Sequence, residues 1–257
     1  MNRRKARVVM LCGNGASSWF MYNALADEVE ILAVVVENRP SARSMIRHRL
    51  RKLGWPTVAG QLCFIVFNRV LARIQRRRMD ELIQRYGLRS TLPSSGILHQ
   101  VDSINSATVR KLLRKLDPDA VVVNGTRIIS RTVIGCIDRP FINTHAGITP
   151  RYRGVHGGYW ALASDDAGNC GVTVHLVDTG VDTGDVLYQD TIRPERIDGF
   201  NTYPIHQLAC AIPLMKAALR DVVDGTLAIR EGVGPSRLWY HPTLAEYFRN
   251  RFSGSAR

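Results

Sequence analysis

The stretch RVVMLCGNGASSWFMYNALADEVEILAVVV, residues 7–36, decides the fold class. Residues 7–12 form a short apolar run that ends in Gly-Asn-Gly, residues 16–25 have apolar side chains at helical spacing, and residues 31–36 form a second apolar run. Strand, tight turn, helix and strand in this order are typical of a β-α-β unit with a parallel strand pair. The pattern predicts an α/β fold with an open, mainly parallel twisted sheet and helices on both faces.

The same alternation of strands and helices resumes after a loop at residues 91–96. We predict a helix at residues 106–116 capped by Ser106, a short helix at 157–164 and a long helix at 203–224 despite Pro213. The predicted strands are residues 120–123, 141–144, 171–177 and 186–192, of which the last two form a hairpin. From Trp239 onward we expect a loose basic tail that frays at residues 253–257.

A basic, helical segment interrupts this alternation after a turn at Asn38-Arg39-Pro40. Residues 41–53 and 58–86 are helical in period and are separated by Gly54-Trp55-Pro56. Residues 39–89 carry 13 Lys and Arg against two acidic residues, whereas the rest of the chain is nearly neutral. Such a helix can pack its apolar face on its own domain, or lie on an anionic membrane or partner. Both interpretations stay open.

Length and composition narrow the class of protein. The chain has 257 residues, of which 45% are hydrophobic and 22% charged, so it is expected to bury a core. We predict a catalytic domain at residues 1–202 that includes an insertion at about 40–90, with the helix and tail of residues 203–257 packed on it. No apolar run is expected to span a bilayer, and the start is not typical of a signal peptide. We therefore expect a cytoplasmic protein.

Metal binding is not indicated by the sequence. The five cysteines are scattered, without a CxxC pair or a cluster at zinc-ligand spacing, and we interpret them as core residues. The histidines also lack ligand-like spacing. We interpret His175 as a strand residue whose ring finds a hydrogen bond.

Asn143 and His145 are the first candidate catalytic residues. Side chains alternate along a strand, so both emerge on one face at the carboxyl end of the predicted strand, where open α/β sheets bind ligands. An amide donor beside an imidazole can hold a developing oxyanion and transfer a proton, which acyl transfer requires. The alternative is that Asn143 caps a turn and His145 is a hydrogen-bonded core histidine. Asp182 follows downstream in a Gly-rich turn.

Two segments of the chain resemble the folate-dependent formyltransferases, a family that includes glycinamide ribonucleotide transformylase, methionyl-tRNA formyltransferase and the sugar N-formyltransferases. They are NTHAGITPRYRG (residues 143–154) and GVTVHLVDTGVDTGDVLYQ (residues 171–189). The resemblance covers roughly residues 7–38 and 100–200. It implies that 10-formyltetrahydrofolate is the co-substrate, that Asn143 and His145 contact the formyl oxygen, and that Asp182 orients the water or histidine that moves the proton. Because a nearby carboxylate favours the imidazolium form, we expect a raised pKa for His145.

The resemblance also implies two binding regions. Folate contacts are expected from the loop after residue 123 and from the turn at 178–184, specifically from Asn124, Gly125, Arg127, Ile128, Ile129, Asp178 and Val181. The Gly-Asn-Gly loop resembles an anion-gripping loop, so acceptor contacts are expected from Gly13, Asn14, Gly15, Ser17 and Arg153. The transformylase has Ser-Asn where this chain has Ala16-Ser17. This difference argues against glycinamide ribonucleotide, the acceptor of the transformylase, as the acceptor of this chain. An ordinary βα turn is the alternative interpretation for each region.

The acceptor is expected to be a small, anionic primary amine, such as an amino sugar linked to a nucleotide. Only 59 residues follow Asp198, so we do not expect initiator tRNA or another nucleic acid as a partner. The alternatives are a phosphoribosylglycinamide formyltransferase, a formyltetrahydrofolate hydrolase and a non-catalytic folate-binding module. Contact of the basic insertion with a membrane or an anionic partner, and a homodimer, are further alternatives that the sequence leaves open.

Overall fold

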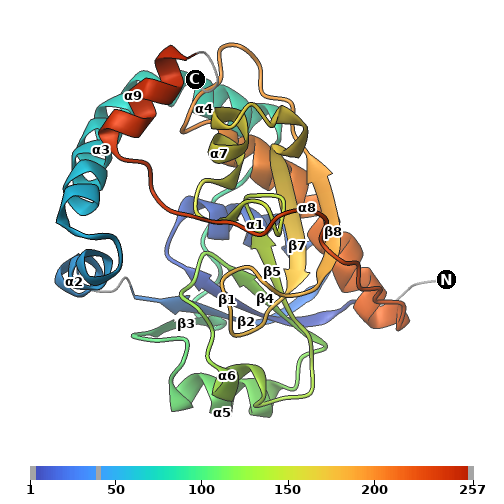
Figure 1. The fold of residues 1–257 in the computed structure, drawn as a ribbon. Helices are drawn as coiled ribbons and strands as arrows, with labels where there is room; N and C mark the ends of the chain where they lie inside the picture. Colours follow the sequence, from blue (N-terminus) through green and yellow to red (C-terminus); the bar gives the residue numbers. More distant parts are fainter. Residues whose placement is uncertain (1–3, 39–41, 254–257) are drawn as a thin grey trace.

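The computed structural model describes residues 4–38 and 42–253, arranged around one twisted sheet (Figure 1). Within these residues the sheet has seven strands in the order β3-β2-β1-β4-β5-β7-β8. The pairs β3-β2, β2-β1, β1-β4 and β4-β5 are parallel, whereas β5-β7 and β7-β8 are antiparallel. The strands are β1 (Arg7–Gly13), β2 (Glu30–Glu37), β3 (Leu98–Val101), β4 (Ala120–Asn124), β5 (Phe141–His145), β7 (Gly171–Leu176) and β8 (Val186–Thr191). The predicted mainly parallel sheet is confirmed.

Helices cover both faces of this sheet, as predicted. On one face, α1 (Ala16–Ala26) and α8 (Tyr203–Asp224) bury apolar side chains against the strands. On the other face, α5 (Ala107–Leu116) and α6 (Arg131–Ile134) do the same, and they lie below the sheet in Figure 1. Ser106 caps α5 as expected, since its hydroxyl accepts a hydrogen bond from the Val109 N–H at 3.3 Å.

The basic insertion forms three helices, and one boundary prediction is wrong. They are α2 (Ala42–Leu53), α3 (Trp55–Ile74) and α4 (Arg76–Arg85). The helix predicted over residues 58–86 starts earlier, because Gly54 adopts a positive φ of 77° and Pro56 fits the first turn, where no N–H donor is needed. It also breaks at Gln75, whose Oε1 accepts from the backbone N–H of Asn201. The predicted turn at residues 38–40 lies mostly outside the described residues.

The segment after Trp239 is ordered, which corrects the prediction of a loose tail. Thr243 and Glu246 form a reciprocal capping box that starts α9 (Leu244–Phe252), and α9 packs on α3. Strand β9 (Leu238–Trp239) pairs with β6 (Arg153–Gly154). The short α7 (Gly157–Ala163) and the 3-10 helix η1 (Ala167–Asn169) complete the elements. An aromatic cluster that includes Phe64, Tyr159, Phe200 and Tyr247 joins α3, α7 and α9. The predicted fraying of residues 254–257 lies outside the described part of the chain.

Helix α3 also differs from the expectation that no segment could span a bilayer. Within the described residues it is the one helix that is long and apolar enough to do so by length and composition, and 17% of its most apolar 18-residue window is buried. The helix nevertheless contacts α2, α4 and α9.

Arg78 of α4 ties the insertion to the segment that precedes α8. Its Nε donates to Asp198 Oδ1 at 2.9 Å, and His206 Nε2 lies 2.8 Å from Asp198 Oδ2. The Asp198 side chain is completely buried. We predict that Arg78→Met lowers the free energy of unfolding by about 3 kcal/mol, because it leaves a buried carboxylate without its guanidinium.

Urea denaturation measures this loss, and Arg77→Met is the matched control. The Arg77 side chain is 92% exposed and pairs with Glu81 at 3.2 Å, an exposed pair worth about 0.5 kcal/mol or less. Equal losses in the two variants would contradict the assignment of Arg78 as the internal anchor.

Candidate active site

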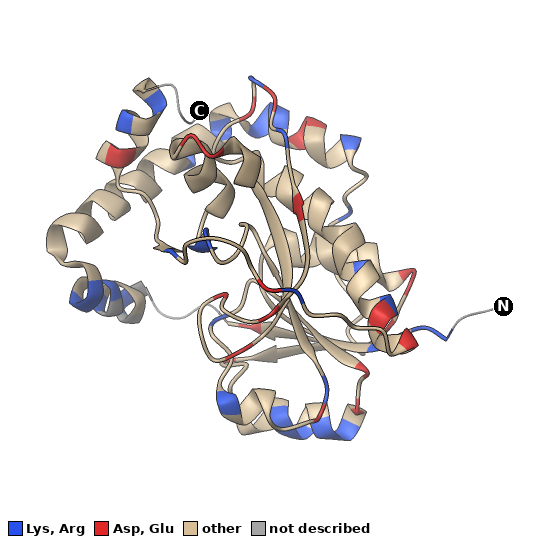
Figure 2. Ribbon diagram, turned by 45° about the vertical axis from the view of Figure 1, so that its right-hand side comes forward, with Lys and Arg blue, Asp and Glu red and all other residues tan. Residues whose placement is uncertain are grey.

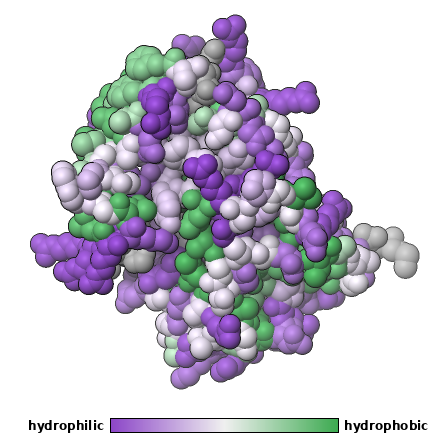
Figure 3. Space-filling view, viewed as in Figure 1, coloured by the Kyte–Doolittle hydropathy of each residue, from purple (hydrophilic) through white to green (hydrophobic). Residues whose placement is uncertain are grey.

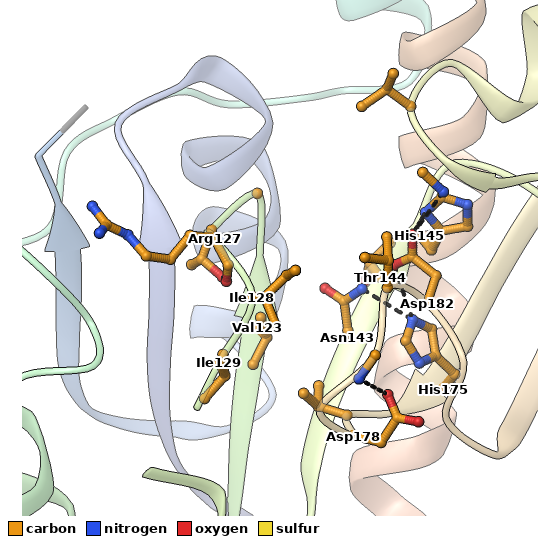
Figure 4. A pocket seen from close by; sticks show the side chains of 17 residues that line it. Val123, Arg127, Ile128, Ile129, Asn143, Thr144, His145, His175, Asp178 and Asp182 are labelled. Atoms are coloured by element: carbon orange, nitrogen blue, oxygen red, sulfur yellow. Dashed lines mark hydrogen bonds and ion pairs between the residues drawn. The ribbon is translucent and has the colours of Figure 1, made fainter. Parts of the chain in front are cut away.

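A cavity of about 440 Å³ lies at the carboxyl ends of β4 and β5 (Figure 4). Its walls come from these strands, from β7, and from the loops that follow β4 and β7. The lining residues are Val123, Gly125 to Ile129, Asn143 to His145, Gly154, Val155, His175, Val177, Asp178 and Gly180 to Asp182. The structure therefore brings Asn143, His145 and Asp182 together, and the predicted common face of Asn143 and His145 lines one wall.

His145 is buried, with 6% of its surface exposed, and both ring nitrogens face oxygen atoms. Nε2 lies 2.6 Å from the backbone carbonyl oxygen of Tyr152, and Nδ1 lies 3.3 Å from Asp182 Oδ2. A carbonyl oxygen only accepts, so Nε2 carries a hydrogen in the neutral ring. Nδ1 then carries the lone pair, beside the carboxylate.

The pKa of His145 lies below its ordinary value, which corrects the expectation of a raised pKa. Burial lowers it because the charged ring loses its hydration, and the carboxylate of Asp182 opposes this shift without reversing it. The neutral ring therefore dominates at neutral pH. In this state the ring can accept a proton at Nδ1.

Asp182 is held as an ionised carboxylate. Burial alone would raise its pKa, but His145, the ring of His175 and the Gly154 N–H together hold that pKa at about 2. The Gly154 N–H donates to Asp182 Oδ2 at 2.9 Å, and His175 Nε2 lies 3.6 Å from Oδ1. Asp182 adopts a positive φ of 50° in the turn after β7, which Asp tolerates better than most residues. Its charge is thus fixed beside Nδ1 of His145.

His175 orients the amide of Asn143. The two residues are direct partners across the antiparallel β5-β7 pair, and Asn143 Nδ2 lies 3.0 Å from His175 Nε2. His175 Nδ1 lies 2.7 Å from the Leu176 carbonyl oxygen, so Nδ1 donates there and Nε2 accepts from the amide. One Nδ2 hydrogen of Asn143 is used in this bond, and the side chain projects into the cavity (Figure 4). The expectation that the His175 ring finds a hydrogen bond is confirmed, although its place in the site was missed.

Most residues expected to bind folate line the same cavity. Gly125, Arg127, Ile128, Ile129, Asp178 and Val181 all line it, and Figure 4 shows Ile128 and Ile129 across the cavity from Asp178. Asp178 Oδ1 accepts from the Gly180 N–H at 3.0 Å and so shapes the turn that carries Asp182.

Asn124, which was also expected to bind folate, does not line this cavity in the described structure. It is buried and donates through Nδ2 to the hydroxyl of Ser18 at 3.2 Å. It therefore connects β4 to α1.

The Gly-Asn-Gly loop lines a second cavity of about 340 Å³, together with Ser17 and the start of α1. A Cβ atom on Gly13 would lie 2.4 Å from the Gly125 carbonyl oxygen, so only glycine allows the two loops to approach this closely. Gly125, Thr126 and Arg127 line both cavities. The Arg127 guanidinium pairs with the buried Glu37 carboxylate, with Nε 2.5 Å from Oε1.

Arg153 lies apart from the Gly-Asn-Gly loop. Its Nη1 donates to the Val181 carbonyl oxygen at 3.1 Å, and its Nε is buried without a hydrogen-bond partner in the described structure. Arg153 therefore supports the turn that carries Asp182. No group of three or more His, Cys, Asp or Glu side chains within the described residues could hold a metal ion.

Comparisons with known proteins match this site region. The family model described as Formyl transferase matches residues 13–198. Methionyl-tRNA formyltransferase from Anaeromyxobacter sp. (strain K) is 32% identical over 129 residues, which are 50% of this chain and 41% of that protein. The enzyme of the same name from Methylacidiphilum infernorum (isolate V4) is 31% identical over 171 residues, 66% of this chain and 51% of that protein. The chain thus spans about half the length of these curated relatives.

Solved structures share the fold. Glycinamide ribonucleotide transformylase 1 from Symbiobacterium toebii aligns with a TM-score of 0.57 and 18% identity, over 89% of this chain and 92% of that one. A sugar N-formyltransferase from Shewanella sp. aligns with a TM-score of 0.54 and 14% identity, over 91% and 76%. At these identities the likeness extends to the fold alone.

Proposed function

Because the chain belongs to the formyl transferase family, we propose that it transfers a formyl group from 10-formyltetrahydrofolate to the primary amine of a small, anionic acceptor. The observation that carries this proposal is the convergence of Asn143, His145 and Asp182 on one cavity wall. These three residues provide an amide donor, a base and an ionised carboxylate, which are the groups that acyl transfer to an amine needs.

The cavity fits the pterin end of the folate. Its volume of about 440 Å³ suits a small ligand, and apolar side chains such as Ile128, Ile129, Val177 and Val181 line it. The backbone groups of residues 125–129 and 178–182 supply donors and acceptors for the ring edges. Bound there, the co-substrate supplies a formyl group whose carbonyl is open to attack by the amine.

His145 moves the proton in this proposal. Attack by the amine places a positive charge on the attacking nitrogen, and Nδ1 of the neutral ring accepts that proton. Asp182 stabilises the imidazolium that forms, because its ionised carboxylate lies 3.3 Å away. The imidazolium then returns the proton to the departing nitrogen of the folate. Asn143 donates to the oxygen that becomes negative during the attack.

His175 acts as a positioning residue. We predict that His175→Phe lowers kcat roughly tenfold to a hundredfold, because the Asn143 amide loses its hydrogen-bond partner and its orientation. The KM for folate stays near the wild-type value. His175→Gln, whose amide oxygen can accept the same bond, restores part of kcat. A His175→Phe variant that raises KM and leaves kcat intact would contradict this role.

The acceptor is proposed to place its anionic group at the second cavity, near Gly13, Asn14, Gly15 and Ser17. The N-terminus of α1 favours negative charge there, and the shared wall of Gly125 to Arg127 joins this cavity to the catalytic one. Arg153 lines neither cavity in the described structure, so we assign it a supporting role, in which its Nη1 holds the Val181 carbonyl oxygen of the turn that carries Asp182. An amino sugar linked to a nucleotide has the required amine and phosphates.

Three alternatives make different predictions in one assay. Tetrahydrofolate release is measured with amino-sugar nucleotides, with glycinamide ribonucleotide, with methionyl-tRNA and without an amine. Stimulation by amino-sugar nucleotides alone supports the proposed acceptor, whereas stimulation by glycinamide ribonucleotide favours the purine enzyme. Equal release without any amine identifies a hydrolase. Folate binding without release in any arm identifies a binding module.

The pH dependence of kcat tests the protonation state of His145. Catalysis needs the neutral ring, so activity is lost as pH falls through the pKa of His145. Since burial holds that pKa below the ordinary value of 6.5, we expect the acid limb of the kcat–pH profile, where kcat falls with falling pH, to lie below pH 6.5. Asp182→Asn removes the charge that opposes burial, so the limb moves to still lower pH. Comparing both proteins on one acceptor cancels the titration of the acceptor amine. A limb above pH 6.5 in the wild type would contradict the neutral resting state.

A further inference from the structure

The outward face of α3 is an apolar stripe. Its largest exposed side chains are Trp55, Leu62, Val66, Val70 and Ile74, of which Trp55 and Ile74 are 74% exposed and Val66 is 60% exposed. From Leu62 onward they are four residues apart, so they follow one side of the helix. Figure 3 shows hydrophobic side chains at the upper left, where Figure 1 places α3 and α9. We refer to these five residues as the α3 stripe.

The opposite face of α3 already has its partners. Phe64 packs on Phe200 and Tyr247, with ring centroids 4.9 Å and 5.2 Å away. Gln61 Nε2 donates to the His241 carbonyl oxygen at 2.8 Å, and Asn68 exchanges hydrogen bonds with Asn201. These contacts hold α3 on the domain, and none of them involves the α3 stripe. The helix is fixed on the domain by one side and presents apolar side chains on the other.

Basic residues surround the stripe. The sequence has no acidic residue between Glu37 and Asp80, and this stretch carries 11 Lys and Arg. Arg43, Arg47, Arg51 and Lys52 of α2 and Arg69 and Arg73 of α3 are exposed, and α2, at the left of Figure 2, carries several blue segments. Apolar side chains framed by cations suit the interface of a membrane that contains anionic lipids.

From this combination we propose that the arm of α2 and α3 docks on an anionic membrane surface, with the α3 stripe in the boundary between headgroups and acyl chains. The helix lies on the bilayer and does not cross it, because crossing would separate Gln61, Phe64 and Asn68 from their partners. A second copy of the chain is a poorer occupant, since its own arm carries the same positive charge. This surface is distinct from the catalytic cavity, and the proposal does not depend on the acceptor.

Vesicle co-sedimentation of the full chain tests this docking. We expect the wild type to sediment with vesicles of phosphatidylcholine and phosphatidylglycerol, and to sediment much less with phosphatidylcholine alone or at high salt. Val66→Glu/Val70→Glu should weaken binding by tenfold or more. The matched control is Ile229→Glu/Val233→Glu, which changes two exposed apolar residues away from the arm, where Val233 is 80% exposed.

The charge contribution is tested in the same way. Arg69→Ser/Arg73→Ser should weaken binding to anionic vesicles several-fold, whereas Lys111→Ser/Lys115→Ser, which removes two exposed cations of α5, should leave it near wild type. Unchanged thermal melts show that the variants fold. The proposal is overturned if the wild type sediments with neither vesicle, if a stripe variant and its control lose binding equally, or if the chain is a dimer that Val66→Glu/Val70→Glu dissociates.

Discussion

His145→Ala is expected to abolish formyl transfer, with kcat reduced roughly 10³-fold or more, while folate binding stays measurable. The ring lies beside Asp182 and can accept a proton at Nδ1, and positioned proton transfer alone contributes roughly 10² to 10⁴ in rate. The apolar residues of the lining loops at 125–129 and 178–182 are unchanged by the substitution. Single-turnover kinetics and folate titration by calorimetry measure the two effects separately.

His99→Ala is the control for this variant, because His99 lies in β3, outside the catalytic cavity. It should leave kcat and folate affinity unchanged. Unchanged turnover in His145→Ala would contradict the proposed proton transfer by His145. Loss of folate binding together with turnover would instead show that His145 supports the cavity and would remove the evidence for its chemical role.

Asn143→Asp is expected to lower kcat by roughly 10² to 10³ or more. The substitution replaces the Nδ2 donor by a carboxylate oxygen of nearly the same shape, so the developing oxyanion loses a donor worth about 3–4 kcal/mol and meets a negative charge. It also removes the bond that Asn143 donates to His175. The rate of the chemical step at saturating folate and acceptor reports this effect.

Asn143→Ala separates the two contributions of this change, since it removes the donor without adding charge. We expect its loss of kcat to be smaller than that of Asn143→Asp, with a similar KM for folate in both. If Asn143→Asp retained the wild-type rate, the amide would not be the oxyanion donor. The polar wall formed by Asn143 and His175 would then have only a structural role.

The parts of the fold that sequence predicts best are those with strong local signals. The strands β1, β2 and β4 are continuous apolar runs, and α5 has both a serine cap and an apolar stripe. Strand β3 was missed because it has four residues, two of them exposed, and depends on pairing with β2. Helix α9 was also missed, although Thr243 and Glu246 have the spacing of a capping box.

For the candidate site, too, sequence predicts the features that have a local signal and misses those that depend on tertiary structure. The two-residue period of a strand predicts that Asn143 and His145 share a face, and the structure has both at the cavity. The importance of His175 depends on the register of β5 against β7, which a single sequence does not specify. The pKa of His145 depends on burial by residues far away in the chain, so the expected direction of its shift was wrong. The roles of these residues in catalysis and binding stay predictions.

Release of tetrahydrofolate from 10-formyltetrahydrofolate tests the central claim most directly. The wild type and His145→Ala are compared with and without the panel of amines. We predict that the wild type releases tetrahydrofolate only when an anionic amine is present, and that His145→Ala binds the folate but releases none. Equal release by both proteins, or a wild type that does not bind the folate, would contradict the account.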